Sequence, residues 1–228
     1  LEQVELAVKH LNDYRPIVGD KVVAQIAELA EPLRGARVVH INATAFGGGV
    51  AEMLQTLVPL MRDAGIDAEW QVIAGDDAFF NVTKAAHNGL QGMDIPFTDD
   101  MKRIWQQYNR VNAEAFEGEY DFVVVHDPQP AGMLHYYDSD GDAHWAWRCH
   151  IDTSHPNPAY WGFFAPYITQ YEAAIFTMEQ YVGPGVDFEH LALVTPTIDP
   201  LSPKNAPISV EEAQRIVGDF GLDVARPI

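Results

Sequence analysis

Hydrophobic and polar positions at the start of the chain follow a helical period. Apolar side chains recur three and four residues apart through residues 1–34, and Pro16 and Gly19 interrupt the pattern. Asp20 follows this interruption and has a side chain suited to a helix N-cap. We therefore expect two helices before the first strand.

The period changes after these helices. The run 37–42 is short, apolar and rich in β-branched residues, and the glycines 47–49 follow it. A helical pattern then ends before Gly65, and residues 68–73 have the composition of a second strand. This order of strand, glycine loop, helix and strand predicts a βαβ unit, which opens a parallel sheet.

The rest of the chain continues the alternation. A helix is expected at about 98–116, and prolines within 195–207 mark a loop. Ser209 and Glu212 resemble a capping box, which begins a last helix that ends near Phe220. Three further strands are expected, at 120–125, 144–151 and 173–177. The fold class is therefore α/β, with a Rossmann-like parallel sheet flanked by helices.

The composition is that of a globular protein. The 228 residues are 47% hydrophobic and 21% charged, which excludes intrinsic disorder and suits one domain or slightly more. No run approaches the length of about 18 apolar residues that a membrane helix needs, and the N-terminus has no signal-peptide pattern. The single Cys149 cannot form an internal disulfide, and we expect it to be buried and inert. These features predict a cytoplasmic protein.

The charge of the chain restricts its partners. Lys and Arg together number 14 and Asp and Glu 33, which gives a formal net charge of −19. Such a surface repels nucleic acid and anionic membranes, so neither is an expected partner. The acidic residues are scattered along the chain, and solubility alone is a sufficient reason for them.

The glycine loop is the first candidate site. Gly47, Gly48 and Gly49 precede a helix N-terminus, where backbone N–H groups and the helix dipole favour a phosphate. The loop is not a dinucleotide fingerprint, because Glu52 stands where that motif needs Gly or Ala. No Lys-Ser/Thr pair of a Walker loop follows it either. A tight turn that uses glycine for backbone freedom is the alternative.

Polar residues end two of the predicted strands. His126 and Asp127 follow one strand, and Arg148, His150 and Asp152 alternate onto one face of the next. Such side chains bind sugar hydroxyls, or transfer a proton near pH 7. Histidine that caps a loop is the alternative, and because no known metal spacing accompanies the cluster, we expect no metal.

Aromatic side chains crowd residues 136–171. Aromatic faces stack on the apolar faces of sugar rings, although most of these residues are expected in an ordinary core. Tyr160 and Trp161 are the likelier exceptions because they follow a proline-rich loop. We therefore include Trp161 among the candidate residues that bind a sugar.

Four segments carry a family resemblance. Residues 41–54, 123–133, 147–164 and 175–182 closely resemble the trehalose-forming branch of the retaining family 4 glycosyltransferases. This branch includes trehalose glycosyltransferring synthase and the retaining trehalose phosphorylases. Enzymes of the family have the GT-B fold, in which two Rossmann-like domains face each other across a cleft.

The resemblance also implies a division of the chain. Residues 1–182 would form the Rossmann-like acceptor-binding domain with its N-terminal helices. Residues 183–228 would form the crossover and an incomplete start of the donor-binding domain, because the family's later donor motif is absent. We therefore expect the N-terminal, acceptor half of a GT-B enzyme, which by itself is inactive.

The resemblance assigns roles at matching positions. His126 and Gly48 would be catalytic, and Gly47, Gly48 and Gly49 would approach the donor phosphate. The acceptor pocket would be lined by Asp127, Arg148, His150, Asp152 and Glu179. No metal or cofactor is implied. The partners would be glucose or trehalose, a nucleotide sugar through the donor domain, and a second copy of the chain in a homodimer.

The implied reaction joins glucose from a nucleotide-diphosphate glucose to a second glucose, with retention at the anomeric carbon. The product is α,α-trehalose. Two alternatives stay open: a retaining trehalose phosphorylase, which forms glucose and glucose 1-phosphate from trehalose and phosphate, and a sugar-binding fragment without turnover. A nicotinamide dehydrogenase is disfavoured by Glu52 in the glycine loop.

Overall fold

The computed structural model describes residues 1–138 and 141–221. The chain divides into two compact units, of which the first is Leu1–Thr197 and the second begins at Ile198. All of the predicted site residues lie in the first unit.

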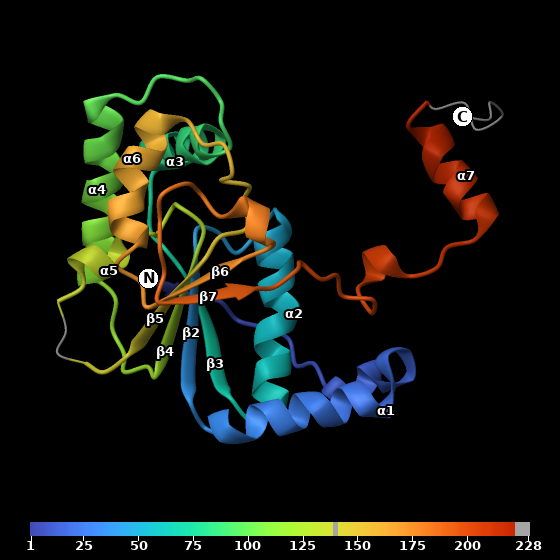
Figure 1. Ribbon diagram of the computed structural model, residues 1–228. Coiled ribbons are helices and arrows are strands. Elements are labelled where there is room, and N and C mark those ends of the chain that lie inside the picture. The colour runs from blue at the N-terminus through green and yellow to red at the C-terminus, as the bar shows by residue number, and fades with distance from the viewer. Residues whose placement is uncertain (139–140, 222–228) are drawn as a thin grey trace. The chain divides into compact units, whose positions relative to one another are not determined.

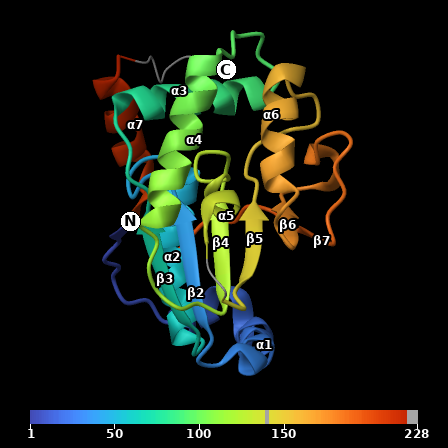
Figure 2. The ribbon, with the colours of Figure 1, turned by 90° about the vertical axis from the view of Figure 1, so that its left-hand side faces the viewer.

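The first unit is built on a seven-stranded sheet with the order β1-β3-β2-β4-β5-β6-β7. Its strands are β1 (Glu2–Gln3), β2 (Arg37–Asn42), β3 (Asp67–Val72), β4 (Phe122–His126), β5 (His144–Arg148), β6 (Ala173–Phe176) and β7 (His190–Leu193). All neighbouring strands are parallel except the pair β1 and β3. Figure 2 shows the strands side by side. The predicted α/β class with a parallel sheet is confirmed.

Helices cover both faces of this sheet. They are α1 (Leu11–Ala30), α2 (Gly49–Asp63), α3 (Asp77–Leu90), α4 (Asp99–Glu114), α5 (Met133–Tyr136) and α6 (Pro158–Ile168), with short 3-10 helices at Glu31–Leu33 and Glu179–Tyr181. α2 lies on one face, and α3, α4, α5 and α6 lie on the other (Figure 1). Strand alternation divides the core accordingly, because Val38 belongs to the cluster beneath α2 and Val39 to the opposite one.

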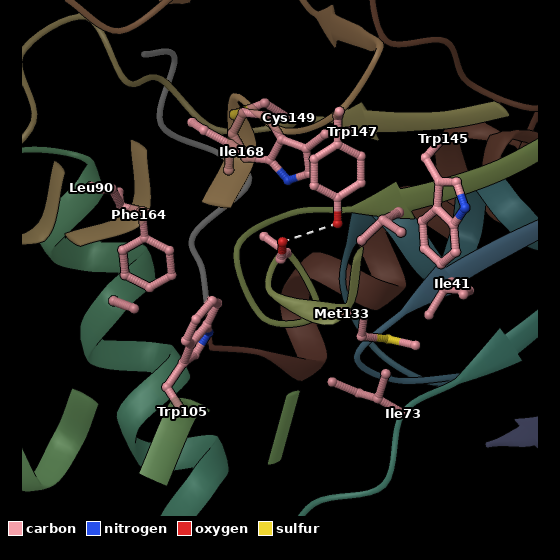
Figure 3. Packing of buried hydrophobic residues seen from close by; sticks show 14 of the residues in the cluster. Ile41, Ile73, Leu90, Trp105, Met133, Trp145, Trp147, Cys149, Phe164 and Ile168 are labelled. Carbon is pink, nitrogen blue, oxygen red and sulfur yellow. Dashed lines mark hydrogen bonds between the residues drawn. The ribbon is translucent and has the colours of Figure 1, made fainter. Parts of the chain in front are cut away.

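The larger core cluster is rich in aromatic rings. Figure 3 shows Trp105 of α4, Trp147 of β5 and Phe164 of α6 among its side chains, and the rings of Trp105 and Phe164 meet edge to face at 4.9 Å. Burying each such side chain contributes about 1.5–3 kcal/mol. Cys149 lies in this cluster with 0% exposure, and burial raises the pKa of its thiol. Its predicted burial is confirmed.

The start of the chain differs from the prediction. Residues Glu2–Gln3 form an edge strand antiparallel to β3, and the amide of Val4 donates to the carbonyl of Trp70 at 2.9 Å. The helix begins only at Leu11, and Gly19, at φ 80°, breaks its backbone geometry as predicted. The helical pattern before Leu11 was wrong because the unpaired edge of β3 takes the backbone of this segment.

The compact first unit extends past the predicted boundary at residue 182. Strand β7 pairs in parallel with β6, and the amide of Val194 then donates to the carbonyl of Phe176 at 2.8 Å. These bonds attach the segment to the sheet as far as Val194, and the compact unit ends at Thr197. The acceptor and donor roles given to the two parts stay predictions.

The second unit contains a 3-10 helix at Pro203–Asn205 and helix α7 (Val210–Asp219). Ser209 accepts the amide hydrogen of Glu212 at 3.1 Å, which confirms the predicted start of this helix. Residues 222–228, the end of the predicted donor-domain segment, lie outside the described residues. Over the described part of the chain, no helix has both the length and the apolarity to cross a membrane.

Candidate functional site

The predicted site residues gather at one edge of the sheet. Strands β2, β4, β5 and β6 are consecutive and parallel, so their carboxyl ends meet where open α/β sheets bind ligands. His126 and Arg148 are the last residues of β4 and β5 and are register partners. The following loops carry Gly47, Gly48 and Gly49 after β2, Asp127 after β4, His150 and Asp152 after β5, and Glu179 after β6.

Three histidines are joined into a row, which we call the histidine chain. Nδ1 of His40 lies 2.9 Å from Nε2 of His126, and Nδ1 of His126 lies 2.9 Å from Nε2 of His150. Both ring nitrogens of His126 are therefore bonded within the chain. His40 and His126 are 5% and 2% exposed, whereas His150 is half-buried. His150 is thus the accessible end.

Burial keeps the histidine chain neutral. It lowers the pKa of His40 to about 4 and, aided by the charge of Arg148, that of His150 to about 4. The pKa of His126 is lowered well below its usual value by burial and by the neighbouring histidines and Arg148. Each ring at neutral pH then has one N–H donor and one acceptor nitrogen.

Asp127 holds the ends of β4 and β5 together. It is the one residue other than glycine with positive φ, 62°, within the parts of the chain that the structure describes. Its amide donates to the carbonyl of Arg148 at 2.9 Å, and its Oδ1 accepts the amide hydrogen of His150 at 2.8 Å. Burial raises the pKa of this carboxyl to about 7. Backbone strain and a shifted pKa at one position are typical of functional sites.

Arg148 is a buried cation that has an unpaired N–H donor among the described residues. It is 5% exposed, and its Nη2 donates to the carbonyl of Val194 at 2.6 Å. Its Nη1 has no hydrogen-bond partner among the described residues, and burial lowers its pKa. Buried polar groups are normally paired, so this N–H group suits an oxygen of a ligand.

The glycine loop is open and lies at the start of α2. Gly47 and Gly48 have φ of 72° and 83°, which only glycine adopts readily, and Gly48 is the N-cap residue without a side-chain cap. Asn42 fixes the base of the loop, because its Nδ2 donates to the carbonyl of Thr44 at 2.9 Å. The positive φ values explain these two glycines as a turn, and the exposed helix N-terminus also suits a phosphate. The donor-phosphate role stays a prediction.

Asp152 and Glu179 lie on neighbouring loops of the same edge. The amide of Ser154 donates to Oδ1 of Asp152 at 2.9 Å, and hydrogen bonds from Ser154 lower the pKa of that carboxyl. Thr153 Oγ1 donates to the carbonyl of Tyr181 at 2.6 Å, which ties this loop to the short helix that begins with exposed Glu179. In the described structure neither carboxylate is bonded to the histidine chain.

Trp161 lies in the larger core cluster. Its ring is 8% exposed, and its indole N–H donates to the carbonyl of Pro184 at 2.8 Å. A Cβ atom on Gly183 would lie 2.2 Å from this ring, so the contact is close. This burial favours the ordinary-core alternative for Trp161, and its sugar-binding role stays a prediction. Tyr160 is buried too and stacks on Phe97 at 4.1 Å.

Two features that position the site were not predicted from the sequence. The first is His40, which could have been noticed as a histidine inside the otherwise apolar run 37–42. The other is α4, whose Trp105 donates to the carbonyl of Pro128 at 3.0 Å and whose Asn109 accepts the amide hydrogen of Gly132 at 2.9 Å. These bonds fix the loop after β4 that begins with Asp127.

The described residues hold no group of three or more histidine, cysteine, aspartate or glutamate side chains arranged to bind a metal ion. In the histidine chain, the facing nitrogens are 2.9 Å apart and share hydrogen bonds, so these lone pairs are already used. The arrangement suits a neutral polar ligand that both donates and accepts hydrogen bonds.

A family model described as Trehalose synthase, N-terminal domain matches residues 40–183, which is more than half of the chain. The chain belongs to this family. The matched range includes the histidine chain, the glycine loop and the other predicted site residues. Membership confirms the resemblance to the trehalose-forming glycosyltransferases.

Individual relatives support this family membership. A trehalose synthase of Rubrobacter xylanophilus is 50% identical over 231 residues, which cover 100% of this chain and 56% of that protein. A trehalose synthase of Thermococcus litoralis is 46% identical over 96% of the chain and 53% of its own length. A trehalose phosphorylase of Pleurotus pulmonarius is 25% identical over 96% of the chain and 33% of its own length. The chain thus spans about half the length of the trehalose synthases it matches.

Proposed function

We propose that this chain is the acceptor-side part of a retaining glycosyltransferase, which transfers glucose from a nucleotide-diphosphate glucose to glucose and forms α,α-trehalose. The observation that carries the proposal is the 50% identity to a trehalose synthase along the whole chain. The polar edge of the sheet supports it with donors and acceptors for a neutral sugar.

The acceptor glucose is proposed to bind beside His150, Asp127 and Arg148. A sugar hydroxyl both donates and accepts hydrogen bonds, and these side chains offer a ring nitrogen, a carboxyl and the unpaired Nη1 donor. Unpaired buried groups discriminate strongly against a sugar that lacks the matching hydroxyl. Asp152 and Glu179 would complete the pocket from the next loops.

The donor phosphates are proposed to meet the glycine loop and the N-terminus of α2. The helix dipole and the free amides there favour the charge that develops on the departing diphosphate. A phosphate oxygen of this leaving group would take the proton of the incoming hydroxyl on the same face of the sugar, which gives retention. The protein then supplies no nucleophile, and the residues of this chain bind and orient.

A trehalose phosphorylase is the second candidate. Its specific support is the 25% identity to the Pleurotus pulmonarius enzyme over almost the whole chain. The acceptor pocket would be the same, and phosphate would replace the nucleotide as the second partner. A third possibility is that the 228 residues alone bind sugar without turnover.

The location and partners remain part of the proposal. We propose a cytoplasmic protein, and the net charge of −19 supports a partner set without nucleic acid or anionic membrane. A homodimer and the absence of a metal or cofactor requirement are proposed on the resemblance. Sedimentation of the chain and assays with a chelator test these points.

Saturation-transfer NMR on the 228-residue chain tests the proposed function. Glucose, trehalose and UDP-glucose are offered separately, and we expect transfer to glucose and trehalose. Transfer to UDP-glucose alone would place the donor site in this chain and contradict the division of labour. Absence of saturation transfer to glucose and trehalose at 100 mM would contradict the proposed acceptor pocket. Trehalose formed by the chain alone from glucose and a nucleotide sugar would overturn its expected inactivity.

A further inference from the structure

His40 lies in the interior of the protein, at the buried end of the histidine chain and away from the accessible end at His150. Its ring is 5% exposed and occupies an interior position of β2, where the neighbouring residues are apolar. Nδ1 is bonded to His126, but Nε2 is buried and has no hydrogen-bond partner among the described residues. A buried imidazole in a central strand is costly, so its position needs a reason.

The histidine chain can carry its protons in two directions. In the first, His40 Nδ1–H donates to His126 Nε2, and His126 Nδ1–H donates to His150 Nε2, so His150 keeps its proton on Nδ1. In the second, all three protons sit on Nε2, and both bonds point back toward His40. Each ring carries one proton in either case, and the net charge is the same.

The unpaired nitrogen of His40 distinguishes these directions. The first leaves an acceptor lone pair at the buried Nε2, whereas the second leaves a buried N–H donor there. Among buried backbone groups, unpaired N–H donors are rarer than under-used carbonyl acceptors, and we apply the same order of cost to the imidazole of His40. The first direction is therefore the stable one.

We infer that His40 is a positioning residue, which fixes the direction of the histidine chain so that His150 presents an Nδ1–H donor at the accessible end. The identification of the recognised group as a sugar hydroxyl oxygen rests on the proposed function. His126, both of whose ring nitrogens are bonded within the histidine chain, transmits the direction from His40 to His150. The catalytic role that the resemblance implies for His126 stays a prediction.

NMR of the chain labelled with ¹⁵N in its histidine rings tests the direction without any substrate. Long-range ¹H–¹⁵N correlations show which ring nitrogen carries the proton, and single His→Gln variants assign the signals. At pH 7.5 we expect Nδ1–H for His40, His126 and His150. Protons on Nε2 of His126 and His150 in the unsubstituted chain would overturn the inference.

Two variants of equal side-chain length test the part played by His40. His40→Gln offers His126 either an N–H donor or a carbonyl acceptor, so both directions become possible and the share of His126 and His150 with the proton on Nδ1 should fall. His40→Met keeps the length but has only a weak acceptor, so their signals should shift to Nε2–H. His144→Gln, at an exposed histidine that pairs with Glu172, is the control and should change neither ring.

The same tautomers in His40→Met as in the unsubstituted chain would mean that His40 does not set the direction. If His40→Met does not fold, the unsubstituted chain still decides, since it must show Nδ1–H, and tautomers in His40→Gln identical to those of the unsubstituted chain would also mean that His40 does not set the direction. Glucose is added only afterwards, and a shift of His150 on its addition tests the ligand. If glucose does not shift His150, the proposed function fails, but the proton direction of the histidine chain still stands. Failure of the proposed function and failure of this inference can therefore be distinguished.

Discussion

Replacing Asp127 by asparagine removes an ionisable group from the end of β4 and keeps its shape. Asparagine tolerates the positive φ of 62° as well as aspartate does. Its side-chain oxygen can also accept the amide hydrogen of His150, as the carboxylate does at 2.8 Å. Asp127→Asn therefore isolates the effect of the charge.

The magnitude follows from the pKa of Asp127, which burial raises from 3.8 to about 7. Between these values the folded protein keeps a proton that the unfolded chain has released, so rising pH lowers the free energy of unfolding. The loss is about 1.4 kcal/mol per pH unit and reaches about 4 kcal/mol above pH 7. Asparagine does not titrate, so the stability of Asp127→Asn relative to the unsubstituted chain should rise by about 4 kcal/mol between pH 4 and pH 8.

Urea unfolding at pH 4, 5, 6, 7 and 8, followed by tryptophan fluorescence, measures this difference. All five tryptophans lie in the first compact unit, so the signal reports on the unit that contains Asp127. Asp152→Asn is the matched control with the opposite sign. Hydrogen bonds from Ser154 lower the pKa of Asp152, so its carboxylate adds stability that is present at neutral pH and lost in acid.

A difference between Asp127→Asn and the unsubstituted chain that does not grow from pH 4 to pH 8 would refute this reasoning. It would mean that Asp127 is ionised in the folded protein and that its charge is compensated. A greater stability of the unsubstituted chain at pH 8 would show the same more strongly.

Three further predictions use the same unfolding assay or sugar binding. Gly48→Ala should cost about 1–3 kcal/mol, because its φ of 83° and ψ of 159° are essentially restricted to glycine. Gly49→Ala, with ordinary φ and no atom within 4 Å of the added Cβ, should cost nothing, and equal effects would contradict the positive-φ argument. Trp161→Phe should lose about 1–3 kcal/mol of stability because it leaves the carbonyl of Pro184 unpaired. Its glucose affinity should not change, and weaker glucose binding would show that Trp161 contributes to the sugar site. Asp152→Ala should weaken glucose binding about tenfold in an NMR titration, and an unchanged affinity would exclude this carboxylate.

Strands β2 and β4 could be predicted from the sequence because each is a short run of mostly apolar residues. β2 begins and ends at the predicted residues 37 and 42, and β4 (Phe122–His126) lies close to the predicted 120–125. Both strands are covered on two faces, so apolar residues, mostly β-branched, fill their interior positions except for His40 of β2. Such runs are recognised without knowledge of their neighbours.

Of the helices that were not predicted, α3 and α6 are the longest, and they were missed for different reasons. α3 had a usable signal, because Asp76 caps it by accepting the amide hydrogen of Phe79 at 2.8 Å, and Phe79, Val82, Ala86 and Leu90 follow with helical spacing. α6 had little, because it is apolar on almost all sides and shows no amphipathic stripe. Its aromatic residues therefore suggested a binding surface where there is a core.

The site was predictable in its residue types and not in its contacts. Polar residues after strands indicated the correct edge of the sheet. β5, however, ends at Arg148 and not at residue 151, because the carboxylate of Asp127 takes the amide of His150 in place of a strand carbonyl. A bond between residues 23 positions apart, like the one between His40 and His126, depends on the assembled sheet.

The most direct test of the acceptor pocket is a titration of the chain, ¹⁵N-labelled in its histidine rings, with glucose, trehalose and UDP-glucose. The account predicts that glucose and trehalose shift the ring signals of His150 saturably, while those of exposed His144 stay in place. No saturable shift of His150 with either sugar up to 100 mM, or a shift with UDP-glucose alone, would contradict an acceptor site at this edge of the sheet.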